Sequence, residues 1–195
     1  MSTKPSLLLY IHGFNSSPKS MKANIMADYV NTHRPDIQLL IPQIPCYPKP
    51  AIALLIQLIE THQSDYKIGL VGSSLGGYLS TWLNQQYGLK AVLVNPAVKP
   101  YELLSDYLGE QTNPYTNEHY TLDHTHIEDL KQLDVERLNE PTDFWLLQQM
   151  GDEVLDYRQA VDKFSVSRQT VEQGGDHSFQ QFERFPEKII QFLKL

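Results

Sequence analysis

The sequence predicts an α/β fold in which a mostly parallel sheet of about six strands carries helices on both faces. Short, continuous apolar runs alternate along the chain with longer stretches of helical periodicity. Several of these runs end directly at turn-forming residues, as strands buried on both faces often do. Because parallel neighbours must be joined by a crossover, usually a helix, the alternation favours a parallel sheet.

The apolar runs interpreted as strands are too short to be independent helices. The first run stops at His12 and Gly13, and it is also too short to cross a bilayer. No small-residue cleavage site follows it, so it does not read as a signal peptide. The predicted strands are Leu7–Ile11, Ile37–Ile41, Lys67–Val71, Ala91–Val94, Phe144–Leu147 and Arg168–Val171.

Helices are predicted between these strands. Ser17 followed by Pro18 resembles an N-cap with proline at the first helical position, so a helix should run from there to about His33. The proline-punctuated stretch Pro42–Pro50 should instead form a loop. The remaining predicted helices lie around Ile52–Ile59, after Gly77 to about Tyr87, at Tyr157–Phe164 and at Phe182–Leu195.

The stretch from Tyr101 to Glu140 departs from this regularity. It is richer in polar, aromatic and histidine residues than the segments around it. We interpret it as a small cap that is inserted over one face of a single domain comprising residues 1–195. No internal repeat, low-complexity run or linker indicates a second domain.

Composition limits the partners that the chain can have. The formal net charge is −7, and acidic and basic residues are interspersed, so no basic stripe is available for nucleic acid. The single cysteine, Cys46, cannot form an intrachain disulfide, which favours a cytoplasmic location. We therefore expect a monomer or weak homo-oligomer that binds neither nucleic acid nor membrane.

The segment Gly72–Gly76 carries the strongest chemical signal. It matches G-x-S-x-G between a predicted strand and a predicted helix, the context in which this motif forms a nucleophile elbow. The glycines let the backbone reverse tightly, and Ser74 would stand free above the sheet as the nucleophile. Ser73 is the neighbouring alternative, but with Ser73 as the nucleophile neither glycine would stand two positions from the serine, as the motif requires. In isolation the motif could equally be a glycine-rich turn.

A serine hydroxyl needs a base and the base needs an acid that orients it. His177 lies in a glycine-rich loop after the last predicted strand, where this base is expected. Asp152 follows the preceding strand and is our choice for the acid. Glu153 should point away from the histidine, and Asp156 lies nearer the next helix, but the sequence leaves both open. The order Ser, Asp, His is that of the α/β-hydrolase fold.

The oxyanion of an acyl-transfer reaction needs preorganised donors. In this architecture they are the amide after the nucleophile and one from the loop after an early strand, which predicts the backbone N–H groups of Leu75 and Phe14. Asn15 and Ser16 could add polar contacts, although capping the following helix is the more ordinary role for such residues.

The other candidate clusters are weaker. Asp123, His124 and His126, with His119 nearby, resemble a metal site in composition, but their spacing is not that of helical zinc ligands. We expect a polar cap surface instead. Cys46 has no evident activating neighbour. The glycines of the elbow match neither a dinucleotide fingerprint nor a phosphate loop, so no metal and no cofactor are expected.

Several segments resemble the YqiA-type esterases, a small bacterial family of α/β-hydrolases. The segment Tyr107–Tyr120 in the cap resembles that family as well, so the resemblance spans nearly the whole chain. It implies a carboxylic-ester hydrolase with Ser74, Asp152 and His177 as its triad and a tendency toward short acyl esters. The matching segments are Leu9–Pro18, Leu70–Tyr78, Val94–Pro100, Leu146–Ala160 and Gly174–Phe179.

We therefore expect a serine esterase that cleaves a small-molecule acyl ester through an acyl-enzyme. The cap and the loop around Tyr47 would shape the acyl pocket, because binding loops gather at the carboxyl edge of such a sheet. An acyl-CoA thioesterase is an alternative, since the same triad cleaves thioesters. A non-catalytic ligand-binding protein on this scaffold is another, although it would not need all three residues.

Overall fold

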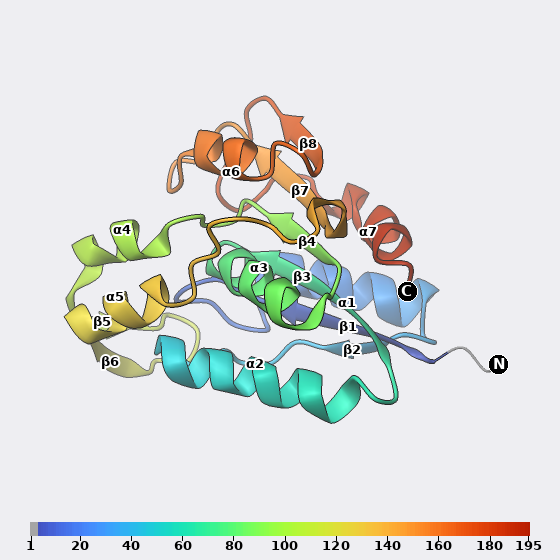
Figure 1. Cartoon of the computed structure of the whole chain (residues 1–195), viewed down its shortest axis with the longest axis horizontal. Helices are drawn as coiled ribbons and strands as arrows, with labels where there is room; N and C mark the ends of the chain where they lie inside the picture. The colour runs from blue at the N-terminus through green and yellow to red at the C-terminus, as the bar shows by residue number, and fades with distance from the viewer. Residues whose placement is uncertain (1–3) are drawn as a thin grey trace.

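The computed structural model describes residues 4–195 and contains the predicted six-stranded parallel sheet (Figure 1). Every neighbouring pair of strands in this sheet is parallel, and the strand order is β2-β1-β3-β4-β7-β8. The strands are β1 (Ser6–Ile11), β2 (Gln38–Leu40), β3 (Lys67–Ser73), β4 (Ala91–Val94), β7 (Phe144–Gln149) and β8 (Arg168–Glu172).

Helices cover both faces of the sheet, as the sequence predicts. Strand β1 shows the reason: Leu7, Leu9 and Ile11 pack into one apolar core, whereas Leu8 and Tyr10 pack into the other. The first core is covered by α2 (Pro48–His62), α3 (Leu75–Tyr87) and α6 (Tyr157–Lys163). The second core is covered by α1 (Met21–His33) and α7 (Pro186–Leu193).

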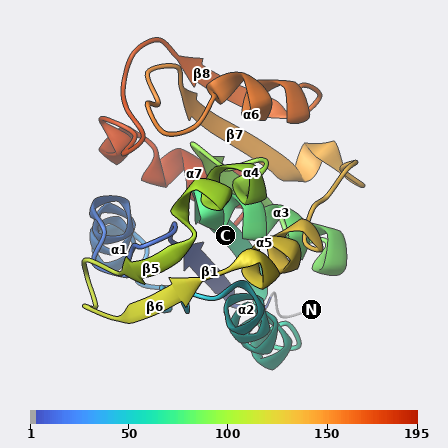
Figure 2. The same cartoon turned by 90° about the vertical axis from the view of Figure 1, so that its left-hand side faces the viewer.

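The first part of the predicted cap, up to Lys131, forms a group of small elements beyond the carboxyl end of β1 (Figure 1). They lie together on the left of Figure 1 and face the viewer in Figure 2. Phe14, in the loop after β1, makes edge-to-face contacts with Tyr107 and Tyr120 of this group. The elements are α4 (Pro100–Leu104), a 3₁₀ turn at Ser105–Tyr107, the antiparallel hairpin of β5 (Gly109–Thr112) and β6 (His119–Leu122), and α5 (His124–Lys131).

The start of α1 differs from the prediction. The helix begins at Met21, with Ser20 and not Ser17 at the N-cap position. The Ser17 hydroxyl accepts a hydrogen bond from the amide of Lys19, and the Ser17 carbonyl accepts one from Ser20. These local bonds close a turn around Pro18, and a serine that bonds its own turn does not cap a helix.

Two further boundaries were wrong, and proline is involved in both. Pro48 occupies the first turn of α2, where its missing N–H costs nothing, so the helix begins inside the predicted loop Pro42–Pro50. The predicted helix Phe182–Leu195 is interrupted at Phe185. A 3₁₀ turn precedes the break, and α7 starts afresh at Pro186, because proline within a helix removes a backbone bond.

Candidate active site

Ser74 lies on a strained turn between β3 and α3. Its backbone has φ 55° and ψ −120°, a combination that residues other than glycine rarely adopt. The turn is held from both sides: the amide of Ser74 donates to the carbonyl of Val94 on β4, and the carbonyl of Ser74 accepts from Gly77 and Ala97. Neighbouring structure therefore fixes the strained conformation.

The glycines of this turn are required by close backbone approaches. A Cβ on Gly72 would collide with the backbone of Gly76, and one on Gly76 would collide with the carbonyl of Ile11. Strands β1 and β3 and the first turn of α3 thus approach so closely that no side chain fits between them. This packing brings the loop after β1 against Ser74.

Ser74, His177 and Asp152 form a chain of hydrogen bonds. The Oγ of Ser74 lies 3.1 Å from Nε2 of His177, and Nδ1 of the same ring lies 2.8 and 3.0 Å from the two carboxylate oxygens of Asp152. The side chain of Asp152 is fully buried, and one of its oxygens also accepts the amides of Val154 and Leu155. A carboxylate held in this way favours the Nδ1–H tautomer, which leaves Nε2 free to accept a proton.

The alternative nucleophile, Ser73, and the alternative acids, Glu153 and Asp156, form no hydrogen bond with the ring of His177. The hydroxyl of Ser73 makes no bond to His177, whose Nε2 is directed at Ser74. Asp156 caps α6 by accepting the amide of Arg158. The expectation that Glu153 points away is wrong, because its carboxylate accepts the backbone amide of His177 at 3.0 Å. It meets the backbone of the histidine and not its ring.

The amides of Phe14 and Leu75 flank Ser74 without acceptors of their own. Within residues 4–195, neither N–H donates a hydrogen bond to another group. The Phe14 loop is anchored by His12, whose Nδ1 lies 3.0 Å from the carbonyl of Gly13 and whose Nε2 accepts the amide of Ile44. Burial lowers the pKa of His12, so the ring stays neutral. Asn15 does not cap a helix; its side-chain oxygen accepts a hydrogen bond from the hydroxyl of Tyr120.

Ser74 opens onto two cavities of different character. One, of about 260 Å³, is mainly apolar. The other, of about 270 Å³, is mainly polar. Four residues line both cavities: Phe14, Asn15, Ser74 and His177. The apolar cavity is completed by Leu75, Ala97, Pro100, Leu103, Leu104, Tyr107, Val154 and Leu155, which come from α4, its neighbours and the turn after β7.

A comparison with models of protein families identifies the family of this chain. The model of the Uncharacterised protein family UPF0227 matches residues 7–194, which is nearly the whole chain. The chain belongs to this family. The resemblance to YqiA-type esterases found in the sequence is thereby confirmed.

Solved structures agree on the fold of this UPF0227 member. It is similar to Est1E from Butyrivibrio proteoclasticus, with a TM-score of 0.77 at 15% identity over 99% of this chain and 88% of that one. It is also similar to the mouse alpha/beta hydrolase domain-containing protein 10, with a TM-score of 0.71 at 16% identity over 100% and 92% of the two chains. An esterase domain from Rhodothermus marinus gives 0.68 at 16% identity over 97% and 87%. The predicted α/β-hydrolase fold is confirmed.

Two buried amides at this site were missed by the sequence interpretation. Asn95, directly after β4, donates to the carbonyls of Asp176 and His177. Gln149, at the end of β7, accepts the amides of Asp176 and Gln180. Together they hold the loop that carries the histidine against the ends of two strands. The only signal in the sequence was their position directly at strand ends.

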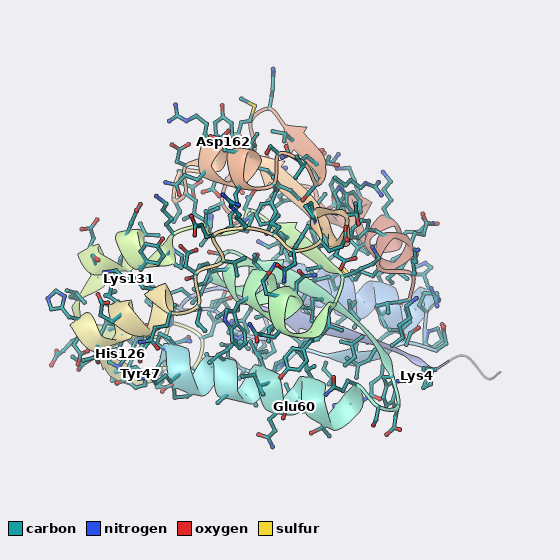
Figure 3. The ribbon with its side chains drawn as sticks, in the orientation of Figure 1. Lys4, Tyr47, Glu60, His126, Lys131 and Asp162 are labelled. Atoms are coloured by element: carbon teal, nitrogen blue, oxygen red, sulfur yellow. The ribbon has the colours of Figure 1, made fainter. Side chains whose placement is uncertain are left out.

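Two members of the candidate metal cluster in the cap, Asp123 and His126, are helix-capping residues. Asp123 accepts the amide of Thr125, and the ring of His126 accepts the amide of Asp123, a reciprocal capping box at the start of α5. His126 also stacks on Tyr47, with ring centroids 4.5 Å apart (Figure 3). Within residues 4–195, no group of three or more histidine, cysteine or acidic side chains is arranged to hold a metal ion.

Cys46 is not placed for nucleophilic chemistry. Its thiol donates to the carboxylate of Glu118, and burial raises the pKa of the thiol to about 11. A thiol that stays protonated at neutral pH is a poor nucleophile. As for membranes, none of the helices in residues 4–195 is both long and apolar enough to cross one.

Proposed function

We propose that this protein is a serine esterase that hydrolyses carboxylic esters with short acyl chains. The observation that carries the proposal is the 3.1 Å contact between the Ser74 hydroxyl and a His177 ring that is bound to buried Asp152. A hydroxyl, a base and an acid in this sequence of contacts form the arrangement that activates serine for acyl transfer.

The first half of the reaction forms an acyl-enzyme. The Oγ of Ser74 attacks the ester carbonyl while its proton passes to Nε2 of His177, and Asp152 stabilises the resulting imidazolium. Negative charge develops on the carbonyl oxygen, and the unpaired amides of Phe14 and Leu75 are the donors available to it. When the tetrahedral intermediate collapses, the carbon–oxygen bond to the alcohol breaks and His177 protonates the departing alcohol.

The second half uses the same groups on water. Water attacks the acyl carbon and gives a proton to His177, the same two amides hold the oxyanion, and the bond to Ser74 Oγ then breaks. His177 returns the proton to Ser74, which restores the enzyme and releases the carboxylic acid. No step needs a group beyond the described residues and water.

The apolar cavity supports short acyl chains. At about 260 Å³ it is slightly smaller than the roughly 300 Å³ at which ordinary ligand pockets begin. Its walls on the cap side come from Leu103, Leu104 and Tyr107, and Val154 and Leu155 close it from the turn after β7. Apolar walls favour a hydrocarbon group through the hydrophobic effect. The likeness in fold to an esterase domain supports the esterase part of the proposal.

The test is the hydrolysis of p-nitrophenyl esters from acetate to dodecanoate by the wild type and by Ser74→Ala. We expect the wild type to favour the short chains, and the variant to lose turnover by several orders of magnitude while its thermal unfolding is retained. Exposed Ser165→Ala is the matched control. Undiminished turnover by Ser74→Ala would overturn the proposal. If Ser73→Ala alone lost turnover, Ser73 would be the nucleophile instead.

Matched oxygen and sulfur esters of one acyl group separate an esterase from a thioesterase. The same triad cleaves both, so the relative kcat/KM decides between them. A wild type that binds these esters in calorimetry without hydrolysing any of them would instead be a ligand-binding protein.

A further inference from the structure

The polar cavity beside Ser74 contains one formally charged side chain apart from histidine. It lies between the ends of β1 and β3, the start of α1 and the loop of His177. Among residues 4–195, those that line it include Lys22 but no aspartate or glutamate. Asp152 lies behind the His177 ring and does not line this space. The cavity therefore presents positive charge next to the serine.

Lys22 keeps most of its charge at neutral pH. Burial lowers the pKa of its ammonium to about 8, and the nearby carboxylates of Asp176 and Asp152 limit the fall. Its Nζ donates one hydrogen bond, at 2.8 Å, to the carbonyl of Ser178. An ammonium carries three N–H donors, so this bond leaves donor capacity for a ligand in the cavity.

The amino terminus of α1 faces the same space. This 13-residue helix begins at Met21, and Ser20, Met21 and Lys22 all line the cavity. The Ser20 hydroxyl makes no capping bond, and the first turn contains no acidic residue. A helix start without a cap leaves N–H groups unpaired and carries the positive end of the helix dipole. Both favour an anion at this point.

Tyr10 provides an independent indication that a ligand belongs here. It extends from β1, lines the cavity and is 0% exposed. Its hydroxyl makes no hydrogen bond of regular geometry within residues 4–195, and the side chain of Ser73, which also lines the cavity, is the polar group beside it. Burial also raises the pKa of this hydroxyl, so that it stays protonated and can donate. An acceptor oxygen placed in the cavity would satisfy it.

We propose that this cavity binds an anionic oxygen group, a carboxylate or a phosphate, that is carried by the ester substrate. Lys22, the first turn of α1 and Tyr10 are its donors, while the apolar cavity takes the hydrocarbon part on the other side of Ser74. The inference rests on the proposed esterase function and specifies its substrate class: an ester that is apolar on one side and anionic on the other.

The Lys22–Ser178 bond also offers a purely structural role for Lys22. Ser178 follows His177, so the lysine could serve only to hold the histidine loop. The loss of such a role would lower kcat/KM for neutral and anionic esters alike. The ratio of the two kcat/KM values cancels any general damage to the loop and therefore isolates recognition of the anion.

The experiment compares matched ester pairs. A carboxylate stands on the alcohol side in 4-(butyryloxy)benzoate, against 4-(butyryloxy)benzamide, and on the acyl side in mono-p-nitrophenyl glutarate, against p-nitrophenyl pentanoate. 4-(Butyryloxy)phenyl phosphate tests a phosphate against the same benzamide. The proteins are the wild type, Lys22→Met, Lys22→Gln and the control Lys19→Met, which removes the same charge from an exposed site in the preceding turn.

We expect the wild type to favour the anionic member of at least one pair. Both Lys22 variants should lower that preference about tenfold to a hundredfold, the range for a lost charge-assisted hydrogen bond, whereas Lys19→Met should leave it unchanged. The pair that responds identifies the side and the anion. The inference is overturned if neutral esters are hydrolysed but the wild type shows no preference for an anionic ester. It is also overturned if both Lys22 variants keep the wild-type preference. Failure to hydrolyse any ester overturns the proposed function instead.

Discussion

Asn95 donates a hydrogen bond from its side-chain amide to the backbone carbonyl of His177 at 3.2 Å, across 82 positions of the chain. The same amide donates to the carbonyl of Asp176, while its carbonyl oxygen accepts the side chain of Gln148 and the backbone of Gln149. Asn95 is 1% exposed. A single buried side chain thus joins the ends of β4 and β7 to the loop that presents the histidine to Ser74.

Asn95→Asp should weaken both the fold and the activity. The substituted carboxylate keeps its acceptor oxygen but faces two carbonyls to which it cannot donate, and burying it there should cost about 2 kcal/mol or more. Urea unfolding measures this loss, and kcat for a short ester should fall because the His177 loop is released. Asn117→Asp, at another asparagine with positive φ but on the exposed hairpin turn, should change neither. Equal effects at both positions would refute this role.

Asp152→Asn should lower kcat by about 10⁴-fold with little change in stability, because an amide in this place favours the wrong tautomer of His177. Glu153→Gln keeps an oxygen that can accept the amide of His177, so its effect should be much smaller. Steady-state kinetics on one p-nitrophenyl ester compares the two. A silent Asp152→Asn together with an inactive Glu153→Gln would assign the acid to Glu153.

The sequence was most informative where structure is decided locally. The Ser74 turn could be predicted because the glycines, the apolar run before them and the helix after them are adjacent in the chain. The central strands β1, β3, β4 and β7 could be predicted because burial on both faces requires short apolar runs. The alternation with helices predicts that the sheet is parallel, but it does not predict the strand order, in which β1 lies between β2 and β3.

The residues missed in the sequence act over long distances or through orientation. Asn95 and Gln149 resemble ordinary polar residues at strand ends until the chain is folded, and their partners lie in the loop after β8. Lys22 was overlooked because a helix that starts at Pro18 puts it in the second turn, whereas α1 starts at Met21 and has Lys22 in its first turn. The N-cap at Ser20 depends on the local turn at Ser17, which competes with capping and is not visible in the pattern of residues.

Gly76→Ala should destabilise the fold strongly. An added Cβ would overlap the carbonyl of Ile11, a backbone atom that cannot move away without shifting β1. Overpacking of this kind typically costs about 1–3 kcal/mol and can cost more. Gly88→Ala is the comparison: its Cβ would meet nothing within 4 Å, but its φ of 64° costs about 1–2 kcal/mol. Urea unfolding of the two variants should show the larger loss for Gly76→Ala, and equal losses would contradict the clash.

Preference for an anionic ester should decrease as the pH rises through about 8. Lys22 is protonated below its pKa of about 8 and neutral above it, so the attraction to an anion is present at low pH and lost at high pH. The carboxylates around it are Asp176 and Asp152, which oppose deprotonation. The titratable groups that line the same cavity are Tyr10, His12, Tyr115 and His177.

The measurement is the ratio of kcat/KM for the preferred anionic ester and its neutral partner between pH 6 and pH 10, corrected for spontaneous hydrolysis. A change in the catalytic groups affects both reactions and cancels in the ratio, and Tyr10 stays protonated because burial raises its pKa. The ratio should fall above about pH 8 in the wild type and in Lys19→Met, and it should be flat in Lys22→Met. A fall of the same size in Lys22→Met would assign the titration to another group.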